Sequence, residues 1–386
     1  MSSQPPSPRE EPPMAFKSLL REPLKTFKPY VAGKPIEEVR REHGLTGRIA
    51  KLASNENPLG VSPLAREAMH RAVDQVGLYA DDHAYYYRRK IAQRHGMDIE
   101  NVFAAAGSVE ILELAGIAFL NEGDEVVTSA GTFAIYYLVP RKAGATLHMV
   151  PMIDGGYRYD IDGIIRAVND KTKIIFLANP TNPTGTWFTG AEFDRLMAAV
   201  PEDVLVVYDA AYTGFYDEQD MPDPLRHLRE GRRVMLSRTF SKAQGLAGIR
   251  AGYGVGPADI VAGLMSCRFP FNINLVAQEG AMAAMDDDDF VRRSREHNDR
   301  ELAFLLAGLA GLPVTIPPSR TNFILIDTKK DATWLFTELQ KTGIIVRPMG
   351  GNGFPGAIRV SPGLREDNER FLAEFRRLME LDAGWR

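Results

Sequence analysis

Cysteine, basic clusters and long apolar runs are all scarce in this sequence of 386 residues. The single cysteine, Cys267, excludes an internal disulfide and a cysteine metal cluster, which is typical of proteins in a reducing compartment. The formal net charge is -4, and the lysines and arginines are scattered along the chain. The sequence therefore lacks the basic cluster that is typical of nucleic-acid-binding proteins. No segment approaches the roughly 18 apolar residues of a membrane span. We therefore expect a cytoplasmic protein with neither a nucleic-acid nor a membrane partner.

Histidine spacing and the composition of the N-terminus exclude two further classes. The histidines form no H-x-x-x-H pair and have no cysteine at ligand spacing, so we expect no metal site. The first residues, MSSQPPSPREEPP, lack the apolar run of a signal peptide and predict a disordered tail over residues 1–13. The remainder is long enough for a large core and a smaller second domain.

Apolar runs and helical patterns alternate along the middle of the chain. This alternation predicts an α/β fold in which a mostly parallel sheet carries helices on both faces. Beyond Asp289 the pattern changes to that of a smaller α+β domain. The strands that we predict for the sheet are residues 102–106, 125–129, 146–150, 173–178 and 204–208, followed by an apolar run at 234–236.

The segment VMLSRTFSKAQGLAGIRAGYGVG, residues 234–256, places Lys242 in a stretch rich in hydroxyls and glycine. A lysine whose pKa is lowered by desolvation or a cationic neighbour can form a Schiff base with a carbonyl substrate or with pyridoxal phosphate. Thr239, Ser241 and Arg250 can bond phosphate oxygens. The segment therefore indicates an anchor for a phosphorylated aldehyde, with a solvated loop lysine as the alternative.

Polar residues follow four of the predicted strands. Ser108 comes at the start of a helix whose unpaired N–H groups would attract phosphate, although a plain helix cap is the alternative. Asn182, in the loop NPTNPTG, and Asp209 and Lys242 follow later strands. Since functional groups gather beyond the carboxyl ends of parallel strands, we expect these residues to meet at one edge of the sheet.

Pyridoxal phosphate would give each of these residues a role. Its pyridine nitrogen must stay protonated, and Asp209 is the carboxylate available at a strand end. Asn182 and Tyr212 can donate hydrogen bonds to the ring oxygen. Phe133, which we place on the helix after strand 125–129, can cover the ring face.

Six motifs occur in order along the chain after the tail. They are KPYVAGKPIEEVRREHGL (residues 28–45), KLASNENPLG (51–60), NPTNPTG (179–185), DAAY (209–212), RTFSKAQGLAGIRAGY (238–253) and FPFNIN (269–274). In these motifs the chain resembles the fold-type I pyridoxal-phosphate aminotransferases, and most closely the histidinol-phosphate aminotransferase family.

The resemblance assigns a role to each candidate residue. It implies that Lys242 holds the cofactor as a Schiff base, that Asp209 pairs with the pyridinium, and that Phe133 stacks on the ring. It also implies three groups of contacts: Asn182 and Tyr212 on the ring hydroxyl; Ser108, the backbone of Val109, Thr239, Ser241 and Arg250 on the phosphate, joined by Tyr79 from a neighbouring subunit; and Arg359 on the anionic group of the substrate, with Arg347 and Tyr30 as helpers and Asn322 close by.

The resemblance implies an aminotransferase that passes an amino group to a 2-oxo acid such as 2-oxoglutarate. Histidinol phosphate is the first choice of donor. The chain departs from the family pattern at Val109, at Ala210-Ala211 and in a missing tyrosine between Arg347 and Arg359. These departures leave open an aromatic amino acid aminotransferase, a decarboxylase of a phosphorylated amino acid, or a cofactor-binding protein without turnover.

The same resemblance predicts the domains and the assembly. We expect an N-terminal arm over residues 14–50 that contributes to the small domain and to dimer contacts. A large cofactor domain would span residues 51–280 and a small domain residues 281–386. Tyr79 lies in the aromatic-rich segment LYADDHAYYY, which favours a homodimer with composite active sites. Packing of these tyrosines within their own chain is the alternative.

Overall fold

The computed structural model describes residues 19–25, 33–217 and 219–381. The prediction for the tail and the candidate Tyr30 therefore lie outside the described residues. The helices are α1 (Ile36–His43), α2 (Pro63–Val73), α3 (Tyr85–His95), α4 (Ser108–Phe119), α5 (Ile135–Ala143), α6 (Ile161–Ala167), α7 (Gly190–Ala199), α8 (Pro224–Arg229), α9 (Ala258–Cys267), α10 (Leu275–Ala284), α11 (Asp288–Leu309), α12 (Ala332–Lys341) and α13 (Arg365–Glu380).

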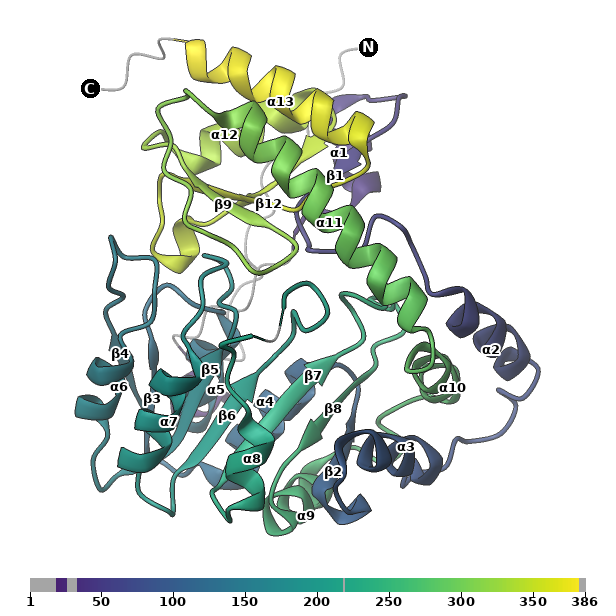
Figure 1. Cartoon of the computed structure of the whole chain (residues 1–386), viewed down its shortest axis with the longest axis vertical. Coiled ribbons are helices and arrows are strands. Elements are labelled where there is room, and N and C mark those ends of the chain that lie inside the picture. Colours follow the sequence, from purple (N-terminus) through teal and green to yellow (C-terminus); the bar gives the residue numbers. More distant parts are fainter. Residues whose placement is uncertain (1–18, 26–32, 218, 382–386) are drawn as a thin grey trace.

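A seven-stranded sheet forms the centre of the larger part of the molecule (Figure 1), with the strand order β2-β8-β7-β6-β5-β3-β4. Only β8 among its strands runs antiparallel to its neighbours, so the sheet is mostly parallel, as predicted. Its strands are β2 (Val102–Ala105), β3 (Glu125–Ser129), β4 (Thr146–Val150), β5 (Thr172–Ala178), β6 (Leu205–Asp209), β7 (Val234–Thr239) and β8 (Gly252–Val255).

Helices bury both faces of this sheet, and the strand sequences show why. Alternate residues of a strand point to opposite faces. In β5, Ile175 and Leu177 pack in the core that includes α6 and α7, whereas Ile174 and Phe176 pack in the core that includes α4 and α5. Because both faces are covered, these strands are continuously apolar rather than alternating.

A second, smaller part packs around its own core, at the top of Figure 1. Its strands are β9 (Ile324–Asp327), β11 (Arg347–Pro348) and β12 (Ala357–Val360), which form an antiparallel sheet in the order β11-β12-β9. The chain before the large sheet also contributes, because β1 (Ala50–Lys51) pairs in parallel with β10 (Ile344–Ile345). Ala50 and Leu52 are thus buried in the small core.

Three local predictions need correction. Phe133 precedes α5, whose N-cap is Ala134, instead of lying on the helix. Ser108 is the first residue of α4, and the N-cap is Gly107, so the hydroxyl of Ser108 does not cap the helix. Asp209 is the last residue of β6 rather than the residue after it. Each shift is one or two residues, the usual uncertainty at the end of an element.

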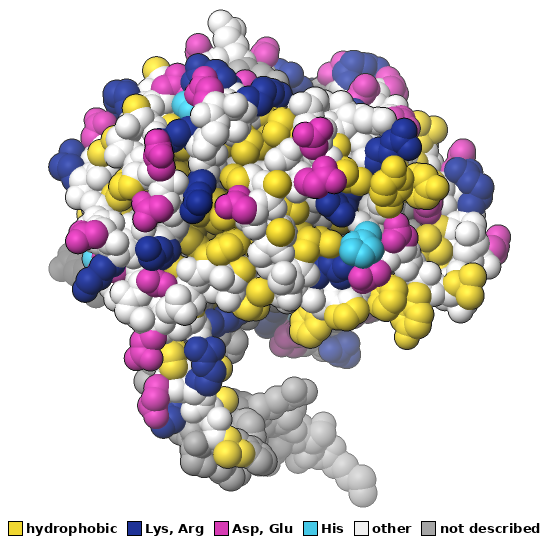
Figure 2. Space-filling view, turned by 90° about the horizontal axis from the view of Figure 1, so that it is seen from below, with side chains coloured by type: hydrophobic (Ala, Val, Ile, Leu, Met, Phe, Trp, Pro, Cys, Tyr) yellow, Lys and Arg dark blue, Asp and Glu magenta, His cyan; other side chains and the backbone are white. Residues whose placement is uncertain are grey.

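One face of the molecule, seen from below, carries Lys and Arg side chains interspersed with Asp and Glu (Figure 2). No broad region of one charge is visible on that face. Among the described residues, no helix is both long enough and apolar enough to cross a membrane.

Candidate active site

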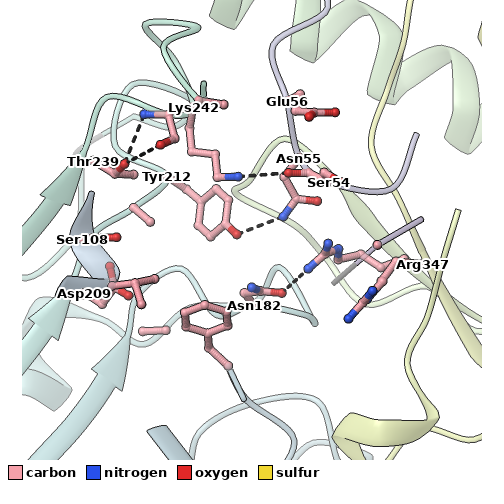
Figure 3. A pocket seen from close by; sticks show the side chains of 18 of the residues that line it. Ser54, Asn55, Glu56, Ser108, Asn182, Asp209, Tyr212, Thr239, Lys242 and Arg347 are labelled. Carbon is pink, nitrogen blue, oxygen red and sulfur yellow. Dashed lines mark hydrogen bonds between the residues drawn. The ribbon is translucent and has the colours of Figure 1, made fainter. Parts of the chain in front are cut away.

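A cavity of about 290 Å³ lies where β2, β5, β6 and β7 end, between the large sheet and the small part. Figure 3 shows side chains from both parts pointing into it. Parallel strands bring their carboxyl ends to this edge, so the convergence predicted from the sequence is confirmed. The predicted residues that line the cavity are Ser108, Val109, Phe133, Asn182, Asp209, Tyr212, Thr239, Ser241, Lys242, Arg250, Arg347 and Arg359.

Lys242 follows β7 and directs its amine into this cavity. The Nζ atom donates a hydrogen bond to the carbonyl of Ser54 at 3.1 Å. Burial, and then the positive charge of Arg359, lowers the pKa of Lys242 to about 7. A buried amine that is partly neutral near pH 7 is a nucleophile and a proton carrier, so the alternative of a solvated loop lysine is wrong.

Asp209 ends β6 with its carboxylate at the cavity wall. Its Oδ2 accepts a hydrogen bond from the hydroxyl of Tyr136 at 2.8 Å, while its Oδ1 is buried and has no hydrogen-bond partner among the described residues. Burial raises the pKa of Asp209 to about 6, although the hydrogen bond from Tyr136 and the nearby backbone N–H of Ala211 oppose this shift. An orphaned buried carboxylate oxygen is costly unless a donor meets it.

Aromatic rings stand beside this carboxylate. Phe133 lines the cavity and meets Tyr136 edge to face, with ring centroids 5.7 Å apart. Tyr136 in turn stacks on Phe176 at 5.3 Å. The ring of Phe133 is thus held from behind by a chain of aromatic contacts, so a flat ligand could lie against it without displacing it.

The N-terminus of α4 and Arg250 form an anion-binding corner. Gly107 has a φ of +84°, and a Cβ there would come within 2.3 Å of the Arg250 guanidinium, so glycine allows the close approach. Arg250 Nη1 donates to the hydroxyl of Ser241 at 3.1 Å, and Thr239 donates to the same hydroxyl at 2.9 Å. Unpaired helix N–H groups, hydroxyls and a guanidinium together suit a phosphate.

Two arginines face each other at the opposite end. Arg347 on β11 and Arg359 on β12 are directly paired in an antiparallel register, so their side chains point to the same face of the small sheet. Arg359 donates to Asn182 Oδ1 and, at 2.8 Å, to the carbonyl of Ala53. The planar guanidinium groups of such a pair suit a carboxylate or a phosphate.

Two other candidates lie elsewhere in this chain. Asn322 is buried but does not line the cavity; its amide donates to the carbonyl of Asn55 at 3.0 Å. Tyr79 is 84% exposed and stacks on Phe271, with ring centroids 4.5 Å apart. Within one chain Tyr79 therefore stays out of the site, and its role in a neighbouring subunit stays a prediction.

Sequence reasoning missed three residues of the site. Tyr136 lies in the segment SAGTFAIYY, residues 129–137, three residues after Phe133. Asn55 and Glu56 both line the cavity and belong to the motif SNENPLG. Glu56 also forms an ion pair with Lys51 at 2.7 Å. The position of Asn55 and Glu56 inside a polar turn was the available signal. The composition of the turn alone did not distinguish these two residues from solvated ones.

The residues present fit the expected cofactor. The unpartnered Oδ1 of Asp209 suits a protonated ring nitrogen, the α4 terminus and Arg250 suit a phosphate, and Lys242 suits an aldehyde. No group of three or more His, Cys, Asp or Glu residues arranged to hold a metal occurs in the described ranges.

Comparisons with known proteins agree with this geometry. The model of the family "Aminotransferase class I and II" matches residues 48–375. The chain is 46% identical over 355 residues to a histidinol-phosphate aminotransferase of an Anaeromyxobacter species, covering 91% of this chain and 96% of that protein. It is 39% identical over 368 residues to histidinol-phosphate aminotransferase 2 of Pseudomonas aeruginosa, with 95% and 99% covered.

Solved structures give the same result. The histidinol-phosphate aminotransferase from Sinorhizobium meliloti, in complex with pyridoxal-5'-phosphate, superposes with a TM-score of 0.86 and is 26% identical. The match covers 94% of this chain and 98% of that one. An aspartate aminotransferase from Thermus thermophilus shares the fold, with a TM-score of 0.81 at 23% identity.

Proposed function

This chain belongs to the class I and II aminotransferases, and on that premise we propose that it transfers an amino group from histidinol phosphate to a 2-oxo acid such as 2-oxoglutarate, with pyridoxal 5'-phosphate as cofactor. One observation carries the proposal: the amine of Lys242, with a pKa lowered to about 7, shares a cavity with an orphaned carboxylate oxygen and an anion-binding helix terminus.

We propose that the cavity residues hold the cofactor from all sides. When bound, pyridoxal phosphate supplies an aldehyde that takes up an amine and a ring that withdraws electrons from it. Lys242 is the attachment point, Asp209 keeps the ring nitrogen protonated, and Phe133 covers the ring. Asn182 and Tyr212 would bond the ring hydroxyl, and Ser108, Val109, Thr239, Ser241 and Arg250 would hold the phosphate.

Lys242 also has the properties of the acid and base of the reaction. Its amine, partly neutral near pH 7, can accept the proton from the substrate carbon that carries the amino group and return it on the cofactor side. The Ser54 carbonyl gives the released amine a resting partner in the cavity.

Arg359 and Arg347 provide the substrate end of the proposed site. Their shared face suits one anionic group, with Tyr30 as a proposed helper and Asn322 close to the same segment. A phosphate or a carboxylate satisfies this requirement equally well. The identity of the donor therefore follows from the relatives rather than from the two arginines.

A panel of amino donors against 2-oxoglutarate tests the substrate. We expect turnover with histidinol phosphate and little with phenylalanine or tyrosine. Activity on the aromatic donors with none on histidinol phosphate would contradict the proposed donor, and release of carbon dioxide would indicate a decarboxylase. Cofactor binding without conversion by any amine would indicate a protein without turnover.

The attachment point has its own test. Borohydride reduction should fix the cofactor on Lys242, and peptide mapping should find the adduct there. Lys242→Ala should lose the adduct. The same adduct in that variant would show that another residue carries the cofactor.

We propose further that the enzyme is a cytoplasmic homodimer of amino-acid biosynthesis with two composite sites. Exposed Tyr79, stacked on Phe271, supports an interface at that segment. Within each chain we propose an arm over residues 14–50, a cofactor domain over 51–280 and a small domain over 281–386. The large sheet and the small part have separate cores, although Ala281, Ala284 and Met285 pack in the large core and Leu52 packs in the small one.

A further inference from the structure

Three consecutive backbone carbonyls, at residues 53–55, each accept a hydrogen bond from a different functional side chain. Ala53 accepts from Arg359 at 2.8 Å, Ser54 from Lys242 at 3.1 Å, and Asn55 from the Asn322 amide at 3.0 Å. The donors come from β12, from the loop after β7 and from the segment just before β9. This short segment therefore ties the small sheet to the cofactor side of the cavity.

The side chain of Asn55 extends this connection. It is 2% exposed, and its Nδ2 donates to the phenol oxygen of Tyr212 at 2.9 Å. The hydroxyl of Ser361, just after β12, accepts from the Asn55 backbone N–H at 3.0 Å and donates to Asn55 Oδ1 at 2.9 Å. Both ends of the amide are thus held, and Figure 3 shows the contact with Tyr212.

The direction of this hydrogen bond has a consequence for Tyr212. A phenol oxygen that accepts from Asn55 cannot direct its own hydrogen toward the same nitrogen. Its O–H is therefore turned away from Asn55. Tyr212 also lines the cavity, where the proposed cofactor would present a ring oxygen.

We propose that Asn55 is a positioning residue that orients the hydroxyl of Tyr212 so that it donates to the ring oxygen of the bound cofactor. The inference rests on the proposed function, because it requires pyridoxal phosphate in the cavity. An amide is needed at this position, since it accepts from Ser361 at one end and donates to Tyr212 at the other. A carboxylate has no hydrogen to donate.

Asn55→Asp tests the orientation of the Tyr212 hydroxyl while it leaves the size of the side chain at position 55 almost unchanged. The residue has a φ of +54°, a conformation that asparagine and aspartate both tolerate, so the backbone should be retained. The carboxylate would draw the hydrogen of Tyr212 to itself. The ring oxygen would then lose a donor and gain a nearby negative charge, and both changes disfavour its ionised form.

The experiment is a pH titration of the visible absorbance of the cofactor-loaded protein. Wild type is compared with Asn55→Asp, Tyr212→Phe and the double variant. Each single variant should raise the midpoint of the absorbance change by about one pH unit, a tenfold change in the equilibrium. The double variant should shift by less than the sum of the two single variants, because both remove the same hydrogen bond and only the added charge of Asn55→Asp acts separately.

Two further variants separate this effect from folding. Ser361→Ala removes the hydroxyl that holds Asn55 Oδ1 and should give a smaller shift in the same direction. Asn57→Asp makes the same chemical change two residues away, where the amide donates to the Ala243 carbonyl and the Ser294 hydroxyl. It should lower the melting temperature of the cofactor-free protein without reproducing the shift.

The possible results show separately whether the role of Asn55 or the proposed function fails. A shift with Tyr212→Phe but none with Asn55→Asp, or a full additional shift in the double variant, overturns the inference alone. No shift with Tyr212→Phe overturns the role of Tyr212 and the inference with it. A wild-type protein that shows no visible band when loaded overturns the proposed function as well.

Discussion

Lys242 and Asp209 show how burial prepares two charged groups for a ligand. Burial disfavours the charged form of each group, so it lowers the pKa of the amine to about 7 and raises the pKa of the carboxyl to about 6. The two values approach each other from opposite directions. In the cofactor-free chain both groups are consequently close to a change of charge near neutral pH.

Asp209→Asn should stabilise the cofactor-free protein while it weakens function. A carboxyl whose folded pKa is raised costs stability above that pKa, and the cost disappears below the unfolded value of 3.8. The gain should therefore appear above about pH 6, be absent below about pH 4, and reach up to about 3 kcal/mol, from a shift of about two units. Urea denaturation at pH 4 and pH 8 measures it.

Asp327→Asn is the matched control, because Asp327 also accepts a tyrosine hydroxyl, from Tyr157 at 2.9 Å, but lies outside the cavity. It should not reproduce the gain at pH 8. Equal stability of wild type and Asp209→Asn at both pH values would contradict the account of Asp209.

At the scale of elements, helix α4 depends on one glycine at its start. Gly107→Ala would place a methyl group on the Arg250 guanidinium and force a conformation that only glycine adopts readily. We expect the dissociation constant of pyridoxal phosphate to rise at least about tenfold, or about 1.4 kcal/mol. Absorbance titration of the cofactor-free protein measures the change.

Gly96→Ala provides the comparison for this prediction. Gly96 ends α3 with a φ of +61°, and a Cβ there would meet nothing within 4 Å. The variant should lose stability from backbone strain, about 1 kcal/mol, yet keep its cofactor affinity. Similar losses of affinity in both variants would show that the corner formed by α4 and Arg250 is not where the phosphate binds.

At the scale of the whole molecule, Tyr79 should complete the site of a partner. Mixing Lys242→Ala with Tyr79→Ala subunits should restore activity, because a hybrid dimer has one site with both residues intact. Random exchange would give about a quarter of the wild-type activity, from the share of intact sites in a two-fold dimer. Sedimentation confirms the dimer, and subunits carrying different tags confirm exchange.

Two results would contradict this assembly. The first is a monomer in sedimentation that is fully active at the same concentration. The second is confirmed exchange of subunits without recovered activity. Either would mean that Tyr79 packs only against its own chain, as it does on Phe271.

Local sequence patterns were sufficient to identify the strand-end residues Ser108, Asn182, Asp209 and Lys242, because a local apolar run followed by a polar residue encodes each of them. Strand–helix alternation then predicted a parallel sheet, and a parallel sheet brings those residues to one edge. The order of the motifs added the family. None of these inferences required knowledge of which distant side chains touch.

The side chains that complete the site could be identified only from contacts between segments that are distant along the chain. Asn55 lies 157 residues from Tyr212 along the chain, and Tyr136 lies 73 residues from Asp209, so no local pattern encodes either hydrogen bond. The reversed direction of β8 and the pairing of β1 with β10 have the same origin. Contacts between distant segments depend on how the elements pack, and the burial that this packing creates moves the pKa values of Lys242 and Asp209 toward neutrality.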